Sequence, residues 1–521
     1  MVTANQARCV PLRTLSKVTD TFSFRSFPLL LRYYLYLCSP KHNYQPFIMK
    51  KFYLMLFAGS LAITALAQEK FESGRPNNAD YRYLDGYKAL KEYIDYSKYP
   101  NFKLAIGTSV PEYLQKSTVY KLTNQNFTET VAGNAMKMGS IVNGNGNMNF
   151  ETVKKYVKEA TDAGLSVYGH TLAWHSQQPI GWLTKLIAGP LTQQEKHDAL
   201  VNAMDRWIKG MMEACDGKVK AWDLVNEAIG GNPNDVDAEG YFNLQNAKQN
   251  NSGSWDVGGD KFYWQDYMGS LEYVRQACRL ARKYGPKDIV LFINDYNLES
   301  DWDDNKKLKS LIHWIKKWEA DGETKIDGIG TQMHVNYYEN SNLQKSSQEH
   351  ITKMFELMAA SGKWVRVSEM DMGYVRGSNK WVSSVKTYQL TETEHKKMAD
   401  FYEWIIKEFF RIVPAAQQWG ICQWCPTDAP DTQYMWRRNE PVGIWDLSYY
   451  RKHVYAGFVR GLNGGEPTAI NKVMTDEAID KIDTSKGIYN LQGVRMQATS
   501  LNELPAGLYI VNGKKVMIRT R

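Results

Sequence analysis

The sequence predicts an α/β protein: a (β/α)8 TIM barrel followed by a small C-terminal β-rich tail module. Strand-like and helix-like segments alternate eight times between about residues 100 and 462. Several strand-like segments, such as 289–293, are short apolar runs, as expected for parallel strands buried on both faces. The chain has 521 residues, enough for a barrel of ~250 residues or more with accessory segments.

The elements of the barrel follow in order along the chain. The predicted strands are 103–109, 129–136, 165–171, 218–226, 289–295, 327–333, 364–370 and 419–424. The predicted helices are 151–163, 195–213, 266–284, 303–319, 348–360, 393–411 and 449–461. Thr192 and Glu195 have the spacing of a capping box at the start of one helix. A doubly wound open sheet is the alternative, but no glycine-rich phosphate loop follows the first strand.

The N-terminal leader has the layout of a signal peptide that starts at Met49. Two lysines follow Met49, then an apolar run, and a small-residue cleavage site ends at Ala67. A transmembrane anchor is the competing interpretation, but the run is shorter than the ~20 apolar residues that a spanning helix needs. We therefore expect 1–48 to be an over-called extension, 49–67 a signal peptide, and 68–99 a polar segment leading into the barrel. Export places the protein outside the cell or on its surface, with the periplasm as another destination.

The positive charge of the chain belongs to this leader. The formal net charge is +8, from 64 basic and 56 acidic residues. Residues 1–67 hold eight of the basic residues and one of the acidic ones, which leaves 56 basic against 55 acidic in the remainder. A nearly neutral remainder gives no support to nucleic-acid binding.

Beyond the barrel, residues 466–521 predict short strands and turns. The Asn512-Gly513 pair between two strand-like runs indicates a hairpin. This tail resembles the C-terminal sorting modules of surface and secreted proteins in Bacteroidetes-type bacteria, which implies export or surface-sorting machinery as a partner. A small β cap on the barrel is the competing interpretation.

The cysteines indicate neither a disulfide scaffold nor a metal site. Four remain after the leader, which is too few for a disulfide-built fold. Cys422 and Cys425 form a C-x-x-C, but no second Cys or His pair lies at metal-ligand spacing nearby, so we interpret them as ordinary strand residues. His170 and His175 lack a companion ligand at suitable spacing, and we expect no metal and no cofactor.

Two glutamates close strand-like runs: Glu227 follows Trp-Asp-Leu-Val-Asn, and Glu369 follows Trp-Val-Arg-Val-Ser. Two carboxylates at the carboxyl ends of parallel strands suit acid-assisted displacement at a sugar carbon, because one can donate a proton while the other attacks. Polar and aromatic residues crowd the other predicted strand ends as well. They are Asn134, Lys137, His170, Trp174, Gln177, Asn226, Tyr296, Gln332, His334, Asp371, Trp424 and Trp436.

From about residue 100 to 462 the chain resembles glycoside hydrolase family 10, the retaining endo-1,4-β-xylanases. The resemblance is carried by an ordered set of motifs. They are Gly-His-Thr-Leu-x-Trp-His-Ser-Gln, Trp-Asp-x-Val-Asn-Glu, Asn-Asp-Tyr-Asn, Asp-Gly-Ile-Gly-x-Gln-x-His and Glu-x-Asp. One motif could arise by chance, but the ordered set could not plausibly do so. The family implies xylan and xylo-oligosaccharides as substrates and water as the second reactant.

The resemblance also implies roles for individual residues. Glu227 would be the acid/base and Glu369 the nucleophile, with the carboxyl groups roughly 5–5.5 Å apart. His334 would hydrogen-bond Glu369, Asp371 would hold His334, and Asn226 would reach the sugar 2-hydroxyl. The residues lining the glycone subsites would be Asn134, Lys137, His170, Trp174, Gln177, Gln332, Trp424 and Trp436. Tyr296 would lie on the aglycone side.

The chain departs from the family pattern at a few positions. Gly133 stands where many members have Glu, which would remove a carboxylate from the second glycone subsite. Met138 replaces a common Trp, Cys425-Pro426 replaces a Gly-containing pair, and Ser368 replaces a Thr. These changes leave the chemistry intact and bear on glycone affinity.

Two other functions compete with an exported, monomeric endo-xylanase. A glucanase or mannanase of the same clan is one, but those enzymes usually have Pro where this chain has Ala228. A non-catalytic xylan-binding surface protein is the other, although both glutamates and His334 are present.

Overall fold

The computed structural model describes residues 73–75, 78–247, 261–433 and 435–462. Beyond them it describes 487–490, 495–497, 504, 507–511 and 514–518. The predicted signal peptide and the extension before it lie outside the described residues. Within the described part of the chain, no helix has the length and apolar character needed to cross a membrane.

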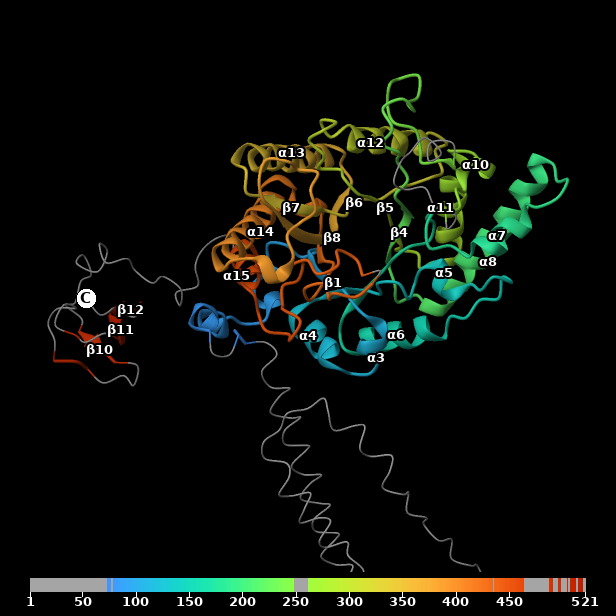
Figure 1. Cartoon of the computed structure of the whole chain (residues 1–521). Helices are drawn as coiled ribbons and strands as arrows, with labels where there is room; N and C mark the ends of the chain where they lie inside the picture. The colour runs from blue at the N-terminus through green and yellow to red at the C-terminus, as the bar shows by residue number, and fades with distance from the viewer. Residues whose placement is uncertain are drawn as a thin grey trace, which may run out of the picture. The chain divides into compact units, whose positions relative to one another are not determined.

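Eight parallel strands of the described chain close into a barrel, which confirms the predicted fold class (Figure 1). Each strand pairs with the next along the chain, and β9 pairs with β1 to complete the ring. The barrel strands are β1 (Lys103–Gly107), β2 (Glu129–Val131), β3 (Ser166–Gly169), β4 (Ala221–Asn226), β5 (Val290–Asp295), β6 (Gly328–Thr331), β8 (Trp364–Val375) and β9 (Gln418–Gln423).

One strand was not predicted. β7 (His334–Tyr338) follows β6 after two residues and pairs only with the outer half of β8, with His334 opposite Asp371. β8 is therefore long enough to pair with both strands: its inner half pairs with β6 in the barrel, and its outer half pairs with β7. This places the start of β7 at the carboxyl end of the barrel, where active sites of this fold are built.

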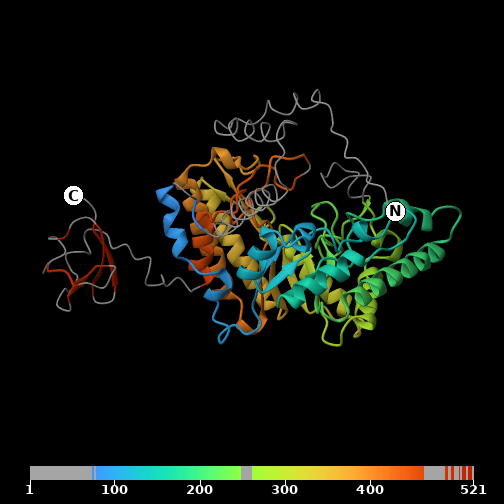
Figure 2. The ribbon, with the colours of Figure 1, turned by 90° about the horizontal axis from the view of Figure 1, so that it is seen from below.

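Helices surround the strands, with α14 and α15 on one side and α7 and α8 on the opposite side (Figure 1); Figure 2 gives the view from below. The helices are α3 (Val110–Leu114), α4 (Thr118–Asn126), α5 (Met138–Ile141), α6 (Glu151–Asp162), α7 (Ile180–Leu186), α8 (Gln193–Cys215), α10 (Gln265–Met268), α11 (Glu272–Tyr284), α12 (Lys306–Glu319), α13 (Ser341–Ala360), α14 (Glu392–Ile412) and α15 (His453–Leu462). The 3-10 helices are η2 (Ala79–Gly86), η3 (Leu90–Tyr93), η4 (Thr387–Gln389) and η5 (Ala415–Gln417).

Sequence signals account for most of these boundaries. The capping box of Thr192 and Glu195 forms as predicted at the start of α8. Several predicted elements have other bounds in the structure; the helix expected over 348–360, for example, begins already at Ser341. The strand expected over 129–136 ends at Val131, because Gly133 turns the chain with a φ of +51°. The helix expected over 266–284 is interrupted at Gly269, whose φ of +83° is incompatible with a helix interior.

The interior of the barrel contains a buried ion pair below the site. Arg366 on β8 donates to Glu129 on β2, and both side chains are almost fully buried. The Arg366 guanidinium also lies 3.6 Å from the centre of the Tyr168 ring. Cys422 is packed among apolar residues of the same layer, which agrees with its interpretation as a strand residue. All four described cysteines are free.

In the described tail, β10 (Ile488–Tyr489), β11 (Gly507–Val511) and β12 (Lys514–Ile518) form an antiparallel sheet. Val511 pairs with Lys514, and the predicted Asn-Gly hairpin falls on the two residues between them, outside the described residues. The sorting role of the tail remains a prediction.

Candidate active site

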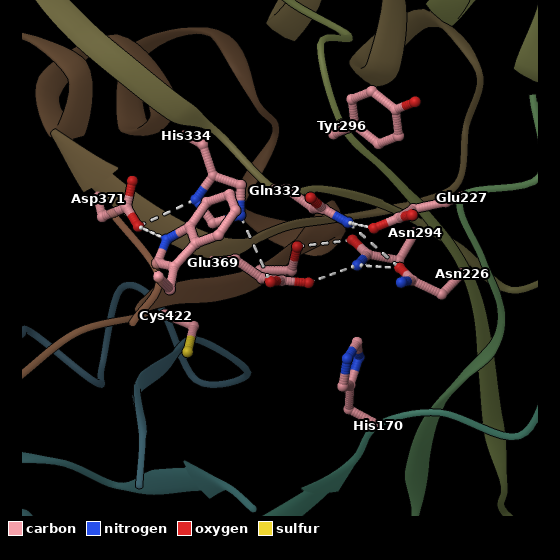
Figure 3. Close-up of polar contacts among 12 residues, drawn as sticks. His170, Asn226, Glu227, Asn294, Tyr296, Gln332, His334, Glu369, Asp371 and Cys422 are labelled. Atoms are coloured by element: carbon pink, nitrogen blue, oxygen red, sulfur yellow. Dashed lines mark hydrogen bonds and ion pairs between the residues drawn. The ribbon is translucent and has the colours of Figure 1, made fainter. Parts of the chain in front are cut away.

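The two predicted glutamates lie close together at the carboxyl end of the barrel, on strands separated by β5 and β6 in the ring (Figure 3). Glu227 is the first residue after β4 and has a φ of +54°, which turns the chain away from the strand direction. Glu369 lies in the middle of β8, the seventh strand of the barrel, and is 6% exposed. The backbone N–H of Glu227 donates to the carbonyl of Asn294 on β5 at 2.7 Å, which holds the turn against the neighbouring strand.

Two different side chains donate to the Glu227 carboxylate. Trp174 Nε1 donates to Oε2 at 2.8 Å, and Gln332 Nε2 donates to Oε1 at 3.0 Å. His175 Nε2 lies 3.9 Å from Oε2, and its ring stacks on Tyr263. Neutral donors hold both oxygens, so the orientation of the carboxylate is defined. The contact with His175 is longer than either of these hydrogen bonds.

Amide side chains connect the two carboxylates (Figure 3). Gln332 Nε2, which bonds Glu227, also approaches Asn226 Oδ1 at 3.4 Å. Asn294 Nδ2 donates to Asn226 Oδ1 at 2.9 Å and to Glu369 Oε1 at 3.1 Å. The chain Glu227–Gln332–Asn226–Asn294–Glu369 is thus continuous and largely buried. It places Asn226 and Gln332 between the glutamates.

Glu369 lies in a positively charged environment. Burial raises the pKa of its carboxyl, but the hydrogen bond from His334 and the charges of His170, His334 and Lys137 hold the pKa below its ordinary value. His334 Nε2 is 3.5 Å from Glu369 Oε2. Glu369 is therefore ionised at neutral pH, the state that a nucleophile requires.

His334 is kept charged by Asp371. Its Nδ1 lies 3.1 Å from Asp371 Oδ2 at an angle poor for a hydrogen bond, so the contact is an ion pair. Burial lowers the pKa of His334, yet Asp371 and Glu369 together raise it to about 10. Burial likewise raises the pKa of Asp371, while His334 and Arg437 bring it down to about 2. Both groups are charged across the neutral range.

Asp371 in turn has two further donors from the loop after β9. Trp436 Nε1 donates to Oδ2 at 2.8 Å, and Arg437 Nη1 donates to Oδ1 at 2.8 Å. The Trp436 ring lies 4.7 Å from the His334 ring, while 49% of the Trp436 side chain stays exposed. Trp436 can therefore offer a face to a ligand while its indole N–H is anchored.

A second group of predicted residues surrounds Lys137. Its Nζ donates to Asn134 Oδ1 at 2.9 Å and to Gln177 Oε1 at 2.7 Å, and lies 4.9 Å from the centre of the Trp174 ring. Burial lowers the pKa of Lys137, and the charges of Glu369 and Glu227 oppose that change. These residues form one polar wall beside the two glutamates.

His170 and Trp424 complete the site on the same side of the barrel. His170 Nδ1 is 2.8 Å from Asp223 Oδ2, and Asp223 Oδ1 accepts from Tyr168 at 2.6 Å. This carboxylate fixes the ring of His170, which is 3% exposed. The Trp424 ring lies 5.8 Å from the His170 ring.

Tyr296 follows β5 and lies on the other side of the two glutamates from His170 (Figure 3). The Nζ of Lys307, a buried residue of α12, is 3.2 Å from the centre of the Tyr296 ring. Lys307 also pairs with Asp295 at 2.8 Å, and Asp295 accepts from the backbone N–H groups of Tyr296 and Ile229. The loops after β4 and β5 are thereby tied to one buried ion pair.

The model of the family described as "Glycosyl hydrolase family 10" matches residues 94–460 of this chain. The match covers more than half of the chain and includes every residue of the site above. The chain belongs to glycosyl hydrolase family 10. This confirms the family that the ordered motifs indicated.

Relatives in family 10 have different lengths. Endo-1,4-beta-xylanase A of Thermotoga maritima is 28% identical over 379 residues, 71% of this chain but only 30% of the relative, so the chain spans less than a third of that protein. A thermostable celloxylanase of Thermoclostridium stercorarium is 26% identical over 406 residues, covering 76% of this chain and 92% of the relative.

Solved structures of family 10 share the fold. A GH10 structure from Paenibacillus barcinonensis has a TM-score of 0.56 at 26% identity and covers 70% of this chain and 96% of its own. A mutant of xylanase10C from Cellvibrio japonicus, in complex with xylopentaose, has a TM-score of 0.59 at 24% identity and covers 74% and 70%.

Three residues of this family 10 site were missed as functional candidates. Asn294 bridges Asn226 and Glu369, and Ser368 Oγ donates to Asn294 Oδ1 at 2.6 Å, which fixes the orientation of that amide. Arg437 is buried against Asp371. Asn294 opens the Asn-Asp-Tyr-Asn motif and Ser368 directly precedes Glu369, so their place in the sequence was a usable signal. Arg437 gave none, because it lies in a long polar loop.

Among the residues that the structure describes, one group of side chains could be considered for a metal. Ligand atoms of Asp237, Glu239 and His313 lie within 4.8 Å of one another. However, Lys317 Nζ is 2.9 Å from the same Asp237 oxygen that His313 contacts at 2.8 Å. The lysine supplies the positive charge that a cation would bring, so we interpret the group as an ion-pair network that ties the loop after β4 to α12.

Proposed function

We propose that the protein is an endo-acting β-1,4-xylanase that cleaves xylan with retention of configuration. The observation that carries the proposal is the pair Glu227 and Glu369, held in different electrostatic surroundings and joined through Gln332, Asn226 and Asn294. Two carboxyls in unlike environments are what acid and nucleophile need, because one must carry a proton while the other stays ionised.

Glu369 is the proposed nucleophile. Its pKa is held low and its Oε1 accepts from Asn294, so one oxygen can attack the anomeric carbon while the other faces His334. Attack forms the covalent glycosyl-enzyme. When the carboxylate becomes an ester it loses its negative charge, and protonated His334 remains paired with Asp371. The ion pair therefore keeps its charge balance through both halves of the reaction.

Glu227 is the proposed acid/base. It protonates the departing glycosidic oxygen and then removes a proton from the incoming water. Trp174 and Gln332 hold its two oxygens with neutral donors, so neither proton transfer breaks a close ion pair. The carboxyl returns to its first protonation state when water has completed the second displacement.

Asn226 and the wall around Lys137 are proposed to bind the sugars on the glycone side. Asn226 lies between the glutamates, where its amide can meet the 2-hydroxyl of the reacting sugar. Lys137, Asn134 and Gln177 offer further donors and acceptors, while Trp174, Trp424 and Trp436 offer ring faces. Sugar rings carry apolar C–H groups on their faces, so aromatic walls suit them. Tyr296 is proposed for the aglycone side.

A β-1,4-glucanase is the second candidate. The name celloxylanase of the Thermoclostridium stercorarium relative points to a substrate range wider than xylan in that protein. The two functions differ in whether the site accepts the C5 hydroxymethyl group of glucose. Product analysis on xylan, mixed-linkage glucan and mannan in parallel separates them, and faster cleavage of glucan than of xylan would contradict the proposal.

The chemistry is tested by Glu369→Ala. We expect the variant to lose hydrolysis, while added azide should yield an α-glycosyl azide from an activated aryl xyloside. Glu239→Ala, an exposed carboxylate in the loop after β4, is the matched control and should retain activity. Normal hydrolysis by Glu369→Ala would exclude this residue as the nucleophile.

Glu227→Ala tests the other role. The rate of the first step should change little for substrates whose leaving group needs no proton, whereas the rate of xylan cleavage should fall strongly. Equal losses on both types of substrate would argue against Glu227 as the acid.

We also propose that the protein is exported after cleavage behind Ala67. The basis is the layout of 49–67 together with the polysaccharide substrate, which cannot enter a cell intact. N-terminal sequencing of the protein from the culture fluid or cell surface should begin at Gln68. A mature protein that still begins at Met49, or that stays with the cytosol, would contradict this.

A further inference from the structure

Two exposed tryptophans stand together at the carboxyl end of the barrel, outside the site described above. Trp302 lies in the loop after β5 and is 50% exposed, and Trp381 lies in the loop after β8 and is 70% exposed. Their ring centres are 5.5 Å apart, with the rings tilted by 57°. Large aromatic surface exposed to water is unfavourable unless it serves an interaction.

The two loops are joined by a specific contact. Lys380, next to Trp381, pairs with Asp301, next to Trp302, at 2.6 Å, and Ser346 on α13 donates to the same Asp301 at 3.0 Å. The Lys380 ammonium also lies 5.0 Å from the centre of one Trp381 ring and 5.5 Å from that of Trp302. Side chains of the pair Lys380 and Asp301 are only 20% and 16% exposed. The rings are thus positioned by partly buried charges rather than left as isolated surface residues.

The strand β7 connects the neighbourhood of the two tryptophans to the catalytic centre. His334 begins this strand beside Glu369, and Tyr338 ends it near Asp301, whose charge acts on the Tyr338 hydroxyl. Four residues of strand span roughly 13 Å. A polysaccharide that leaves the catalytic carboxylates along β7 would therefore reach the two rings after a few sugar units.

We propose that Trp302 and Trp381 form a distal platform that stacks sugar rings of a xylan chain beyond the subsites next to the glutamates. The proposal rests on the xylanase function proposed above. A polysaccharide suits the surroundings better than a second copy of this chain, because Lys380 and Asp301 place hydrogen-bonding groups at the edge of the rings, where sugar hydroxyls would lie. A protein interface would favour a more continuous apolar surface.

The test compares a polymer with a short substrate in the full-length protein. For Trp302→Ala/Trp381→Ala, the ratio of kcat/KM on xylan to kcat/KM on an aryl xylobioside should fall about fivefold, as expected for the loss of aromatic stacking. The fall should come from KM on xylan. Trp302→Phe/Trp381→Phe, which keeps two rings, should recover most of the ratio. Tyr96→Ala, an exposed aromatic at the amino end of the barrel, is the matched control and should keep the wild-type ratio.

Binding gives an independent measurement. In the Glu369→Ala background, removal of both tryptophans should weaken the retardation of the protein by soluble xylan in affinity electrophoresis. If the wild type cleaves xylan and the double variant binds and cleaves it equally well, the platform is overturned while the proposed function stands. A wild type that does not cleave xylan would instead overturn the proposed function. Dimerisation of the wild type that is lost in the double variant, without a change in KM, would assign the pair to self-association and also overturn the platform.

Discussion

Replacing Asp371 by Asn tests the electrostatic design of the site. The pKa of His334 is raised from 6.5 to about 10, mainly by Asp371 and also by Glu369, against the opposing effect of burial. At about 1.4 kcal/mol per pH unit, this corresponds to roughly 5 kcal/mol of preference for the charged form in the folded state. His334 is 14% exposed and Asp371 is fully buried, so solvent screens the pair little.

The raised pKa sets the sign of the pH dependence. A group whose pKa is higher in the folded state stabilises the fold fully below its unfolded pKa, and this contribution is lost as the pH rises through the folded value. For His334 the loss falls between pH 6.5 and about 10. Asp371, with its pKa lowered to about 2, is ionised throughout this window and contributes a constant amount.

The assay is the free energy of unfolding by denaturant at pH 6 and pH 10, in wild type and in Asp371→Asn. We expect the variant to be less stable by roughly 3 kcal/mol at pH 6, and the difference to shrink to about 1 kcal/mol at pH 10. Glu408→Gln is a matched control: Glu408 pairs with Arg411 near the end of α14, and because the pKa of Glu408 is lowered and that of Arg411 is raised, both stay charged over this range. Its difference from wild type should be the same at both pH values. An equal difference at both pH values for Asp371→Asn would refute the reasoning.

Three further changes have defined outcomes. Trp174→Phe removes the indole donor to Glu227, and kcat on xylan should fall tenfold or more, because a hydrogen bond to a charged group contributes ~1.5–3 kcal/mol. The fall should be smaller on an aryl xyloside that has a good leaving group, and equal falls on both substrates would contradict the role of this contact. Gly133→Ala places a side chain at a φ of +51°, 3.3 Å from a backbone oxygen, and should lower the free energy of unfolding by about 1 kcal/mol; an unchanged midpoint in denaturant would argue against the strain. Thr192→Ala removes the capping box of α8 and should cost about 1 kcal/mol by the same measurement, whereas the exposed Thr→Ala change at Thr432 should cost little.

The barrel strands were predictable from sequence because several are short apolar runs and strand-like segments alternate with helical ones along the chain. β7 was not predictable, because its five residues closely follow the β6 motif and the strand pairs only with the outer half of β8. The residues at strand ends were predictable for the same reason as the strands. Arg437 was missed because nothing local in a polar loop tells that a single arginine is buried against Asp371. Burial of that kind depends on contacts between elements distant in sequence.

The contacts among site residues were less accessible than their identities. Sequence placed Asn226 and Gln332 near Glu227, but the bridge through Asn294 to Glu369 depends on the register between β4 and β5, which pairs Asn226 with Asn294. A shift of one residue would turn Asn294 to the other face of the sheet. Spacing along a chain does not specify the register of parallel strands, so the connection could only be seen in the folded protein.

The unequal lengths of β4 and β8 give the two carboxyls unequal freedom to move. Glu369 lies within a twelve-residue strand whose inner half pairs with β6 and β9 and whose outer half pairs with β7, so paired backbone holds it from both directions along the strand. Glu227 is the first residue beyond its strand, at the start of the loop after β4. The proposed reaction uses this difference: attack by Glu369 needs a fixed line of approach to one carbon, whereas Glu227 must exchange a proton with a departing sugar first and with a water afterwards. The carboxyl that is held more rigidly thus reacts with one partner in each turnover, and the carboxyl at the start of a loop reacts with two.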